Sequence, residues 1–121
     1  MPLIVTKLTE PRIVKDWPVV VPTALDGGKI RKDELLVDFQ VLPQSEVDDI
    51  IKTAQDAGDN YNKVLMRAVV KSINGKVDEA NQPILFNEDT LSDSLDCSNQ
   101  LGAFVGAFFD VQNGRKPARK N

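Results

Sequence analysis

The hydrophobic period of the chain changes at Pro43, and this change constrains the fold more than any other feature. Before Pro43, apolar side chains occupy alternate positions, most clearly Leu35, Val37, Phe39 and Val41. A period of two is typical of a strand with one buried face. After Pro43, apolar residues recur three and four positions apart, which is typical of amphipathic helices. The sequence therefore predicts an α+β fold with its strands first and its helices second.

The first strand is predicted over residues 12–22, which are rich in β-branched and aromatic side chains. Pro18 and Pro22 interrupt it, and proline has no N–H to donate to a neighbouring strand, so this strand is expected to be short or at a sheet edge. Residues 26–28 (Asp-Gly-Gly) are a turn signal, because glycine tolerates positive φ. The strands on either side are therefore predicted to form an antiparallel hairpin with a loop longer than two residues.

Helices are predicted after Pro43 wherever a capping-type side chain precedes an apolar stripe. The expected caps are Ser45, Asp59, Asn87 and Ser98. The helices that follow are expected over 45–58, 59–74, 87–95 and 98–112.

The second of these helices has a competing prediction. Val64, Val69 and Val70 are β-branched and would suit a strand, although the 3.6-residue period favours a helix. The expected architecture is an N-terminal antiparallel β-hairpin packed against three to four α-helices. It forms one domain over 1–114, with 1–11 and 115–121 as flexible ends.

The chain has no histidine and a single cysteine, Cys97. It therefore cannot build a Ser-His-Asp or Cys-His nucleophile, the usual metal site, or an intrachain disulfide. A hydrolase that uses only carboxylates remains open, but the adjacent acids at 48–49 and 88–89 point about 100° apart on a helix and do not converge. We expect no catalytic residue, cofactor or metal, a reducing compartment, and a small, partly buried side chain at Cys97.

Charge is distributed unevenly along the chain. Residues 1–76 balance, residues 77–114 carry acids and no base, and residues 115–121 are basic. The folded body lacks the concentrated basic face that nucleic-acid binding needs. No apolar run approaches the roughly 20 residues of a membrane-spanning helix, and the N-terminus does not resemble a secretion signal. Neither a nucleic acid nor a membrane is an expected partner.

The last predicted helix carries small residues four apart, Gly102 and Gly106, on one side and Phe104, Phe108 and Phe109 on the other. Glycine costs about 1 kcal/mol in a helix interior relative to alanine, so two of them indicate close packing. Packing within the domain is the stronger interpretation, and packing against a partner is the alternative. The candidate partner-binding residues are Trp17, Gly102, Phe104, Gly106, Phe108 and Phe109.

Several segments, taken in order, resemble a known family over about residues 15–121. They are 17–22 (WPVVVP), 26–28 (DGG), 35–39 (LLVDF), 64–70 (VLMRAVV), 75–87 (GKVDEANQPILFN) and 104–109 (FVGAFF), followed by a glycine, basic residues and Lys120-Asn121. This order resembles the tail assembly chaperones of siphovirus-type, lambdoid long-tailed bacteriophages and prophages. In that family the turn often reads Asp-Glu-X-Gly-X-Pro. Here Asn81 replaces the glycine, and asparagine also tolerates a left-handed backbone.

The resemblance implies a non-catalytic protein that binds the tape measure protein, keeps it soluble and helps recruit tail tube subunits. It also implies a location in the host cell cytoplasm and absence from the mature virion. A frameshifted longer form of the chain and a low-order homo-oligomer are further implied partners.

Two other classes of function remain open. A structural minor tail or tail completion protein would stay in the virion, although such proteins polymerise through long strands and most of this chain is predicted to be helical. A carboxylate-based enzyme is the third class.

Overall fold

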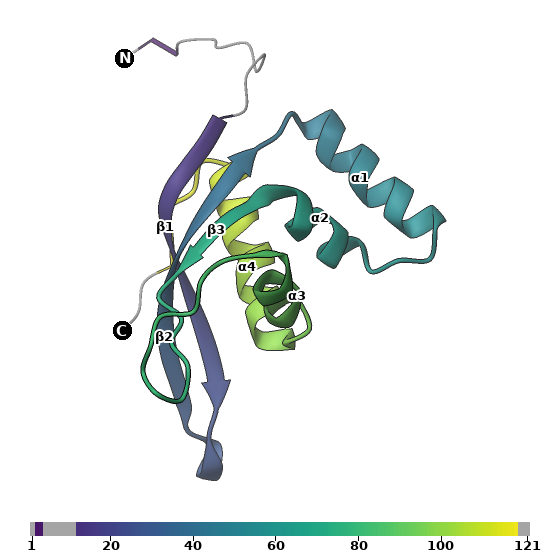
Figure 1. Cartoon of the computed structure of the whole chain (residues 1–121). Coiled ribbons are helices and arrows are strands. Elements are labelled where there is room, and N and C mark those ends of the chain that lie inside the picture. Colours follow the sequence, from purple (N-terminus) through teal and green to yellow (C-terminus); the bar gives the residue numbers. More distant parts are fainter. Residues whose placement is uncertain (1, 4–11, 119–121) are drawn as a thin grey trace.

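The computed structural model describes residues 2–3 and 12–118, so most of the expected flexible segments 1–11 and 115–121 lie outside the described residues. The chain forms an N-terminal antiparallel hairpin and a third strand, packed against four helices (Figure 1), which confirms the α+β prediction. The elements are β1 (Arg12–Ala24), the 3-10 turn η1 (Asp26–Gly28), β2 (Ile30–Val41), α1 (Gln44–Asp56), α2 (Tyr61–Val69), β3 (Val70–Asn74), α3 (Glu88–Leu95) and α4 (Ser98–Gln112).

The strands form one antiparallel sheet in the order β1-β2-β3. β1 is an edge strand, as Pro18 and Pro22 predict, but with 13 residues it is not short. The hairpin turn requires its glycines, since φ is +74° at Gly27 and +80° at Gly28. The long hairpin that results extends beyond the helices at its loop end (Figure 1).

The third strand replaces part of a predicted helix. α2 ends at Val69, and Val70–Asn74 pairs with β2 as β3, so the prediction of one helix over 59–74 was wrong. The buried side chains of Val70 and Ile73 explain the change, because β-branched residues pack well on a pleated surface. The strand alternative was correct for the second half of this segment.

The helix starts differ from those predicted at three of four positions. α1 begins at Gln44 after Pro43 and has no side-chain cap, so Ser45 does not cap it. Asn60, not Asp59, caps α2. Cys97 precedes α4 in place of Ser98 and makes no cap hydrogen bond. The cap position is wrong by two residues for α1 and by one residue for α2 and for α4. The fourth prediction is confirmed, because Asn87 caps α3 in a reciprocal capping box.

A β-bulge interrupts the pairing of β1 with β2. Val14 pairs with Phe39 and Trp17 with Val37, so two residues of β1 stand opposite one residue of β2. At this bulge Asp16 has φ of +54°, and its backbone N–H donates to Oδ1 of Asp38 at 2.9 Å.

The helices lie on one face of the sheet (Figure 1), and the core forms between them. Phe39 of β2 packs against Phe108 of α4, with 6.1 Å between the ring centroids. α4 is also tied to the end of β2, because the side-chain amide of Gln112 exchanges two hydrogen bonds with the backbone of Leu42. The largest fully buried side chains are Phe39, Phe104, Phe108, Leu65, Met66, Leu95, Val19, Val37, Val47 and Val69.

Candidate functional site

A groove of about 730 Å³ opens where the loop end of the hairpin leaves the helices. We call residues 22–32 the hairpin arm and this space the arm groove. One wall is the arm, the other is the segment that follows β3, and the floor is the first turn of α4. The groove is lined by Thr23 and Arg31 of the arm with Asp33 next to it, by Lys76, Val77 and Ile84 of the second wall, and by Asn99 and Gln100 of the floor.

The second wall is a small turn held by Asp78. Its carboxylate accepts hydrogen bonds from the backbone N–H groups of Ala80 and Gln82 at 2.9 and 3.0 Å. Asn81 has φ of +61°, which confirms the left-handed backbone expected there. The turn begins at Gly75, where φ is +107° and a Cβ would lie 3.3 Å from a backbone oxygen of β2. Only glycine lets this segment leave the sheet so close to β2.

The floor is attached to the arm by Asn99. Its amide nitrogen donates to the backbone oxygen of Pro22 at 3.0 Å and lies 3.3 Å from Oγ1 of Thr23. The neighbouring Gln100 has its Oε1 buried without a hydrogen-bond partner among the described residues. The floor of the groove therefore carries an amide whose buried oxygen lacks a donor, and a rotation of this side chain would bring the oxygen to a bound molecule.

Lys76 is the half-buried cation of the groove. Its ammonium donates to Oγ of Ser94, which is fully buried and donates in turn to the backbone oxygen of Thr90 at 3.1 Å. Burial lowers the pKa of Lys76 below its usual 10.5, although the nearby Cys97 and Asp93 act in the opposite direction. Lys76 forms no ion pair within the described part of the chain.

The contact between Lys76 and Ser94 raises the question of nucleophilic catalysis, because Ser-Lys pairs serve that purpose in some hydrolases. Ser94 is fully buried on α3, and its hydroxyl is used by the backbone of the same helix. In this structure Oγ of Ser94 is closed to a substrate, because it is buried and in contact with Lys76. The pair therefore joins α3 to the end of β3.

Two of the phenylalanines predicted to bind a partner lie inside the domain. Phe104 and Phe108 are fully buried, so neither can contact a partner of the folded domain, and the prediction was wrong for both. Phe109 is half-buried and packs edge-on against Phe108 with 5.3 Å between ring centroids. Trp17 is half-buried against the core, and its Nε1 has no partner among the described residues. The structure does not bring the six predicted residues together on one surface.

The glycines of α4 face solvent. Both Gly102 and Gly106 are exposed, and a Cβ built at either position meets nothing within 4 Å. The interpretation that they permit tight packing within the domain was therefore wrong, while their role toward a partner stays a prediction. Cys97 is exposed, in contrast to the expected partly buried side chain.

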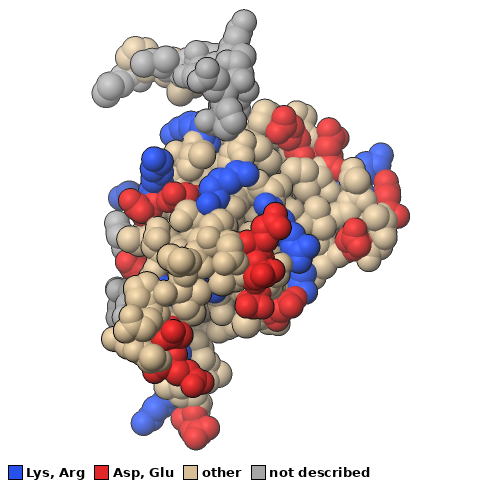
Figure 2. All heavy atoms as spheres, in the orientation of Figure 1, with Lys and Arg blue, Asp and Glu red and all other residues tan. Residues whose placement is uncertain are grey.

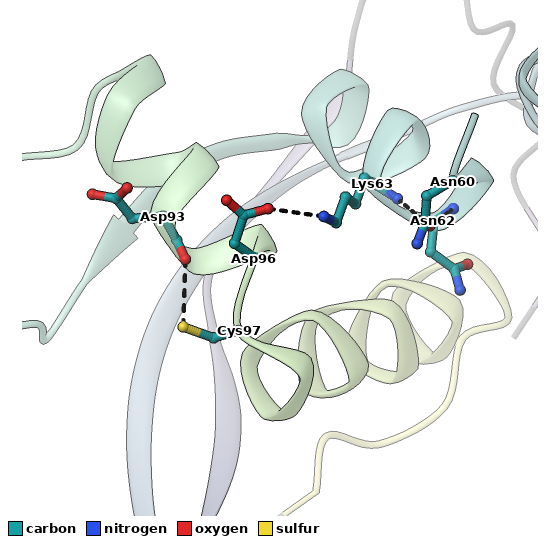
Figure 3. A network of polar contacts seen from close by, with 6 residues as sticks. All are labelled: Asn60, Asn62, Lys63, Asp93, Asp96 and Cys97. Carbon is teal, nitrogen blue, oxygen red and sulfur yellow. Dashed lines mark hydrogen bonds and ion pairs between the residues drawn. The ribbon is translucent and has the colours of Figure 1, made fainter.

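A second polar network joins α2 to the end of α3 (Figure 3). Nζ of Lys63 lies 2.8 Å from Oδ1 of the exposed Asp96, and Sγ of Cys97 contacts the backbone oxygen of Asp93 at 3.4 Å. The hydrogen bond and charge of Lys63, aided by Arg67, lower the pKa of Asp96. An exposed pair of this kind contributes little to stability and offers no reactive group.

Charged side chains of both signs lie on the face seen in Figure 2, where several acidic groups gather near the centre with basic ones beside them. Within residues 2–3 and 12–118, no group of three metal-ligating side chains gathers and no helix is long and apolar enough to cross a bilayer.

Sequence reasoning did not select Lys76 or Gln100, because a lysine after an Asn-Gly pair and a glutamine in a helix have no distinctive pattern. Comparisons of the chain with models of known protein families, with curated proteins and with solved structures found no match.

Proposed function

We propose that this chain is a tail assembly chaperone of a long-tailed bacteriophage. It binds the tape measure protein, keeps it soluble and helps recruit tail tube subunits in the host cytoplasm. The observation that carries the proposal is the exposure of large apolar side chains on the arm and on the segment that faces it across the groove. Leu25 and Ile30 of the arm are 45% and 55% exposed, and Val77 and Leu85 of the facing segment are 52% and 79% exposed.

Val77 and Leu85 belong to residues 75–87, one of the segments on which the family resemblance rests, and Leu25 and Ile30 flank another, residues 26–28. A domain that leaves several large apolar side chains exposed on two neighbouring segments has a surface suited to a protein partner. A largely helical, apolar partner such as a tape measure protein would cover such a surface. The absence of histidine and the inaccessible Ser94 also favour a binding role over a catalytic one.

Low-order self-association and a frameshifted longer form are parts of the same proposal. The basic residues from Arg115 onward would join the added domain of the longer form to α4. Sedimentation across micromolar concentrations tests the self-association, and a strictly monomeric profile would contradict it.

Co-expression with the tape measure protein of the same phage tests the proposal. We expect a soluble complex with the wild-type chain and an insoluble tape measure protein without it. The double variant Ile30→Ser with Leu85→Ser is expected to lose the complex while remaining folded. Tyr61→Ser, at a position 40% exposed on α2, is the matched control and should retain the complex.

Two results would contradict the proposal. A tape measure protein that stays insoluble in the presence of the wild-type chain would remove its main support. Detection of the chain in purified virions by mass spectrometry would favour a structural minor tail or tail completion protein instead.

A further inference from the structure

We propose that the arm groove binds a partner segment in which an acidic side chain lies between apolar ones, and that its carboxylate pairs with Lys76. The identity of the partner protein rests on the proposed function, whereas the chemistry of the segment follows from the groove itself.

Lys76 lines the groove as a cation that has no ion pair among residues 2–3 and 12–118. Arg31 is paired with Asp33 at 2.8 Å. Glu34 pairs in register with Val20, while its neighbour Leu35 is buried under the helices, so strand alternation directs the side chain of Glu34 to the other face of the sheet. Lys76 has a hydroxyl as its acceptor and no ion pair in the described part of the chain. An incoming carboxylate is therefore complementary in charge to the groove.

Asp93 does not occupy this role. It lies close enough to attract the ammonium of Lys76 but forms no ion pair with it. Because Lys76 is half-buried, a carboxylate brought into contact with it would interact in a medium less polar than water. The pair would then contribute more than an exposed surface pair does.

A second polar group makes a peptide the fitting ligand. Gln100 lines the groove, while its Oε1 is turned away from solvent and has no donor among the described residues. Rotation of the Gln100 side chain would bring its amide oxygen to the groove, where a peptide backbone N–H can donate to it while the peptide's carboxylate accepts from Lys76. A simple inorganic anion would satisfy only the lysine.

The apolar part of the segment is set by the wall beside Lys76. Val77 and Ile84 line the groove and are partly exposed. Apolar side chains on either side of the acidic residue would cover them and remove both surfaces from water. The favoured ligand is thus an acidic residue flanked by residues such as leucine.

Amide-resolved NMR with two synthetic peptides tests the inference. The probes are N-acetyl-Leu-Glu-Leu-amide and the same peptide with glutamine, each titrated into the full isotope-labelled chain at millimolar concentration. We expect saturable shifts at Gly75, Lys76 and Gln100 with the glutamate peptide, and about tenfold weaker binding of the glutamine peptide. Lys76→Gln should bring the two peptides to equal affinity, while Lys71→Gln, on an exposed position of β3, should change neither.

Equal binding of both peptides to the wild-type chain, or shifts confined to other surfaces, would overturn the inference. The peptide comparison uses the wild-type chain, so it remains decisive even where Lys76→Gln fails to fold. It also needs no tape measure protein. Selective peptide binding without a tape measure complex would contradict the proposed function but not the inference about the groove. A tape measure complex without peptide selectivity would contradict the inference about the groove but not the proposed function.

Discussion

The two ends of the β1–β2 hairpin differ in what covers their helix-facing side. Near the middle of the sheet, Val37 and Phe39 are fully buried beneath the helices. Toward the loop, Thr23 and Arg31 occupy the same face but line an open groove. One pair of strands thus supplies both the core and the accessible surface. The start of α4 therefore marks the boundary between the buried and the open part of the hairpin. The first turn of α4 is attached to the arm at Pro22 and Thr23, and beyond this point no helix covers the strands.

The largest expected effect is a difference in the free energy of unfolding between a substitution in the core and one in the arm. Phe104→Ala removes a fully buried ring and should lower the free energy of unfolding by about 3–5 kcal/mol. Ile30→Ala, in the exposed arm, should change it by less than about 0.5 kcal/mol. Urea denaturation followed by circular dichroism measures both. If Ile30→Ala lowered the free energy of unfolding by a similar amount, the arm would have to pack against the rest of the domain. The two ends of the hairpin would then not differ in burial.

The outer side of α4 gives the next largest effect, with the opposite sign. Replacing both Gly102 and Gly106 by alanine should raise the free energy of unfolding by about 1 kcal/mol per site, because neither new methyl group meets another atom. The same urea titration detects the gain. If the isolated domain is stabilised but self-association or the tape measure complex is lost, these glycines contact a partner. A loss of stability would instead mean that the outer side of α4 is covered.

The third prediction concerns the hydrogen bonds between Gln112 of α4 and the end of β2, and how much they contribute to the free energy of unfolding. Gln112→Met keeps the length of the side chain but removes both hydrogen bonds to the backbone of Leu42, which should cost about 1–2 kcal/mol. Gln44→Met is the matched control, since the amide of Gln44 bonds only to the exposed Asp48. Thermal melts of the two variants should differ, and identical melting temperatures would show that solvent replaces the Gln112 bonds at no cost.

The smallest effect depends on pH and concerns Lys76. Because burial lowers its folded-state pKa below 10.5, the unfolded chain holds more protons on this group between the lowered pKa and 10.5. The contribution of Lys76 to the free energy of unfolding therefore rises with pH between the lowered pKa and 10.5. At pH values below the lowered pKa, the buried ammonium is charged and destabilises the fold by its full amount. Relative to Lys76→Met, the wild-type chain should gain stability as the pH approaches 10.5. Lys71→Met controls for the loss of an exposed lysine, and a pH-independent difference for Lys76→Met would contradict the lowered pKa.

Much of this fold could be predicted from local patterns. The hairpin followed from the alternation of residues 35–41 and from the glycines at 27–28, and α3 followed from the cap at Asn87. β3 could not be predicted with certainty, because Val69 and Val70 fit both a helix and a strand until β2 is available as a partner. Tertiary pairing decided between two local preferences that were nearly balanced.

The site was much less predictable than the fold. Phe104 and Phe108 were good candidates for either the core or an interface, and a one-dimensional pattern does not state which side of a helix is covered. The arm groove depends on how far α4 reaches along the hairpin. The position of Lys76 depends on the element before it. Residues 70–74 form β3 and not the end of the predicted helix, so the sequence prediction placed Lys76 elsewhere.

The bulge at Lys15 and Asp16 has a consequence for insertions and deletions. Upstream of it the even-numbered Val14 shares the helix-facing side with Phe39, whereas downstream the odd-numbered Trp17 and Val19 do so. The bulge therefore reverses the parity of β1, and the loss of one codon here would restore an unbroken alternation. Val14 and Trp17 would then stand two positions apart, and residues two apart lie on the same face of a regular strand. A one-residue deletion between Val14 and Trp17 therefore keeps the apolar side chains of β1 on the helix-facing side, whereas a deletion in a regular part of the strand would turn one half of them toward water.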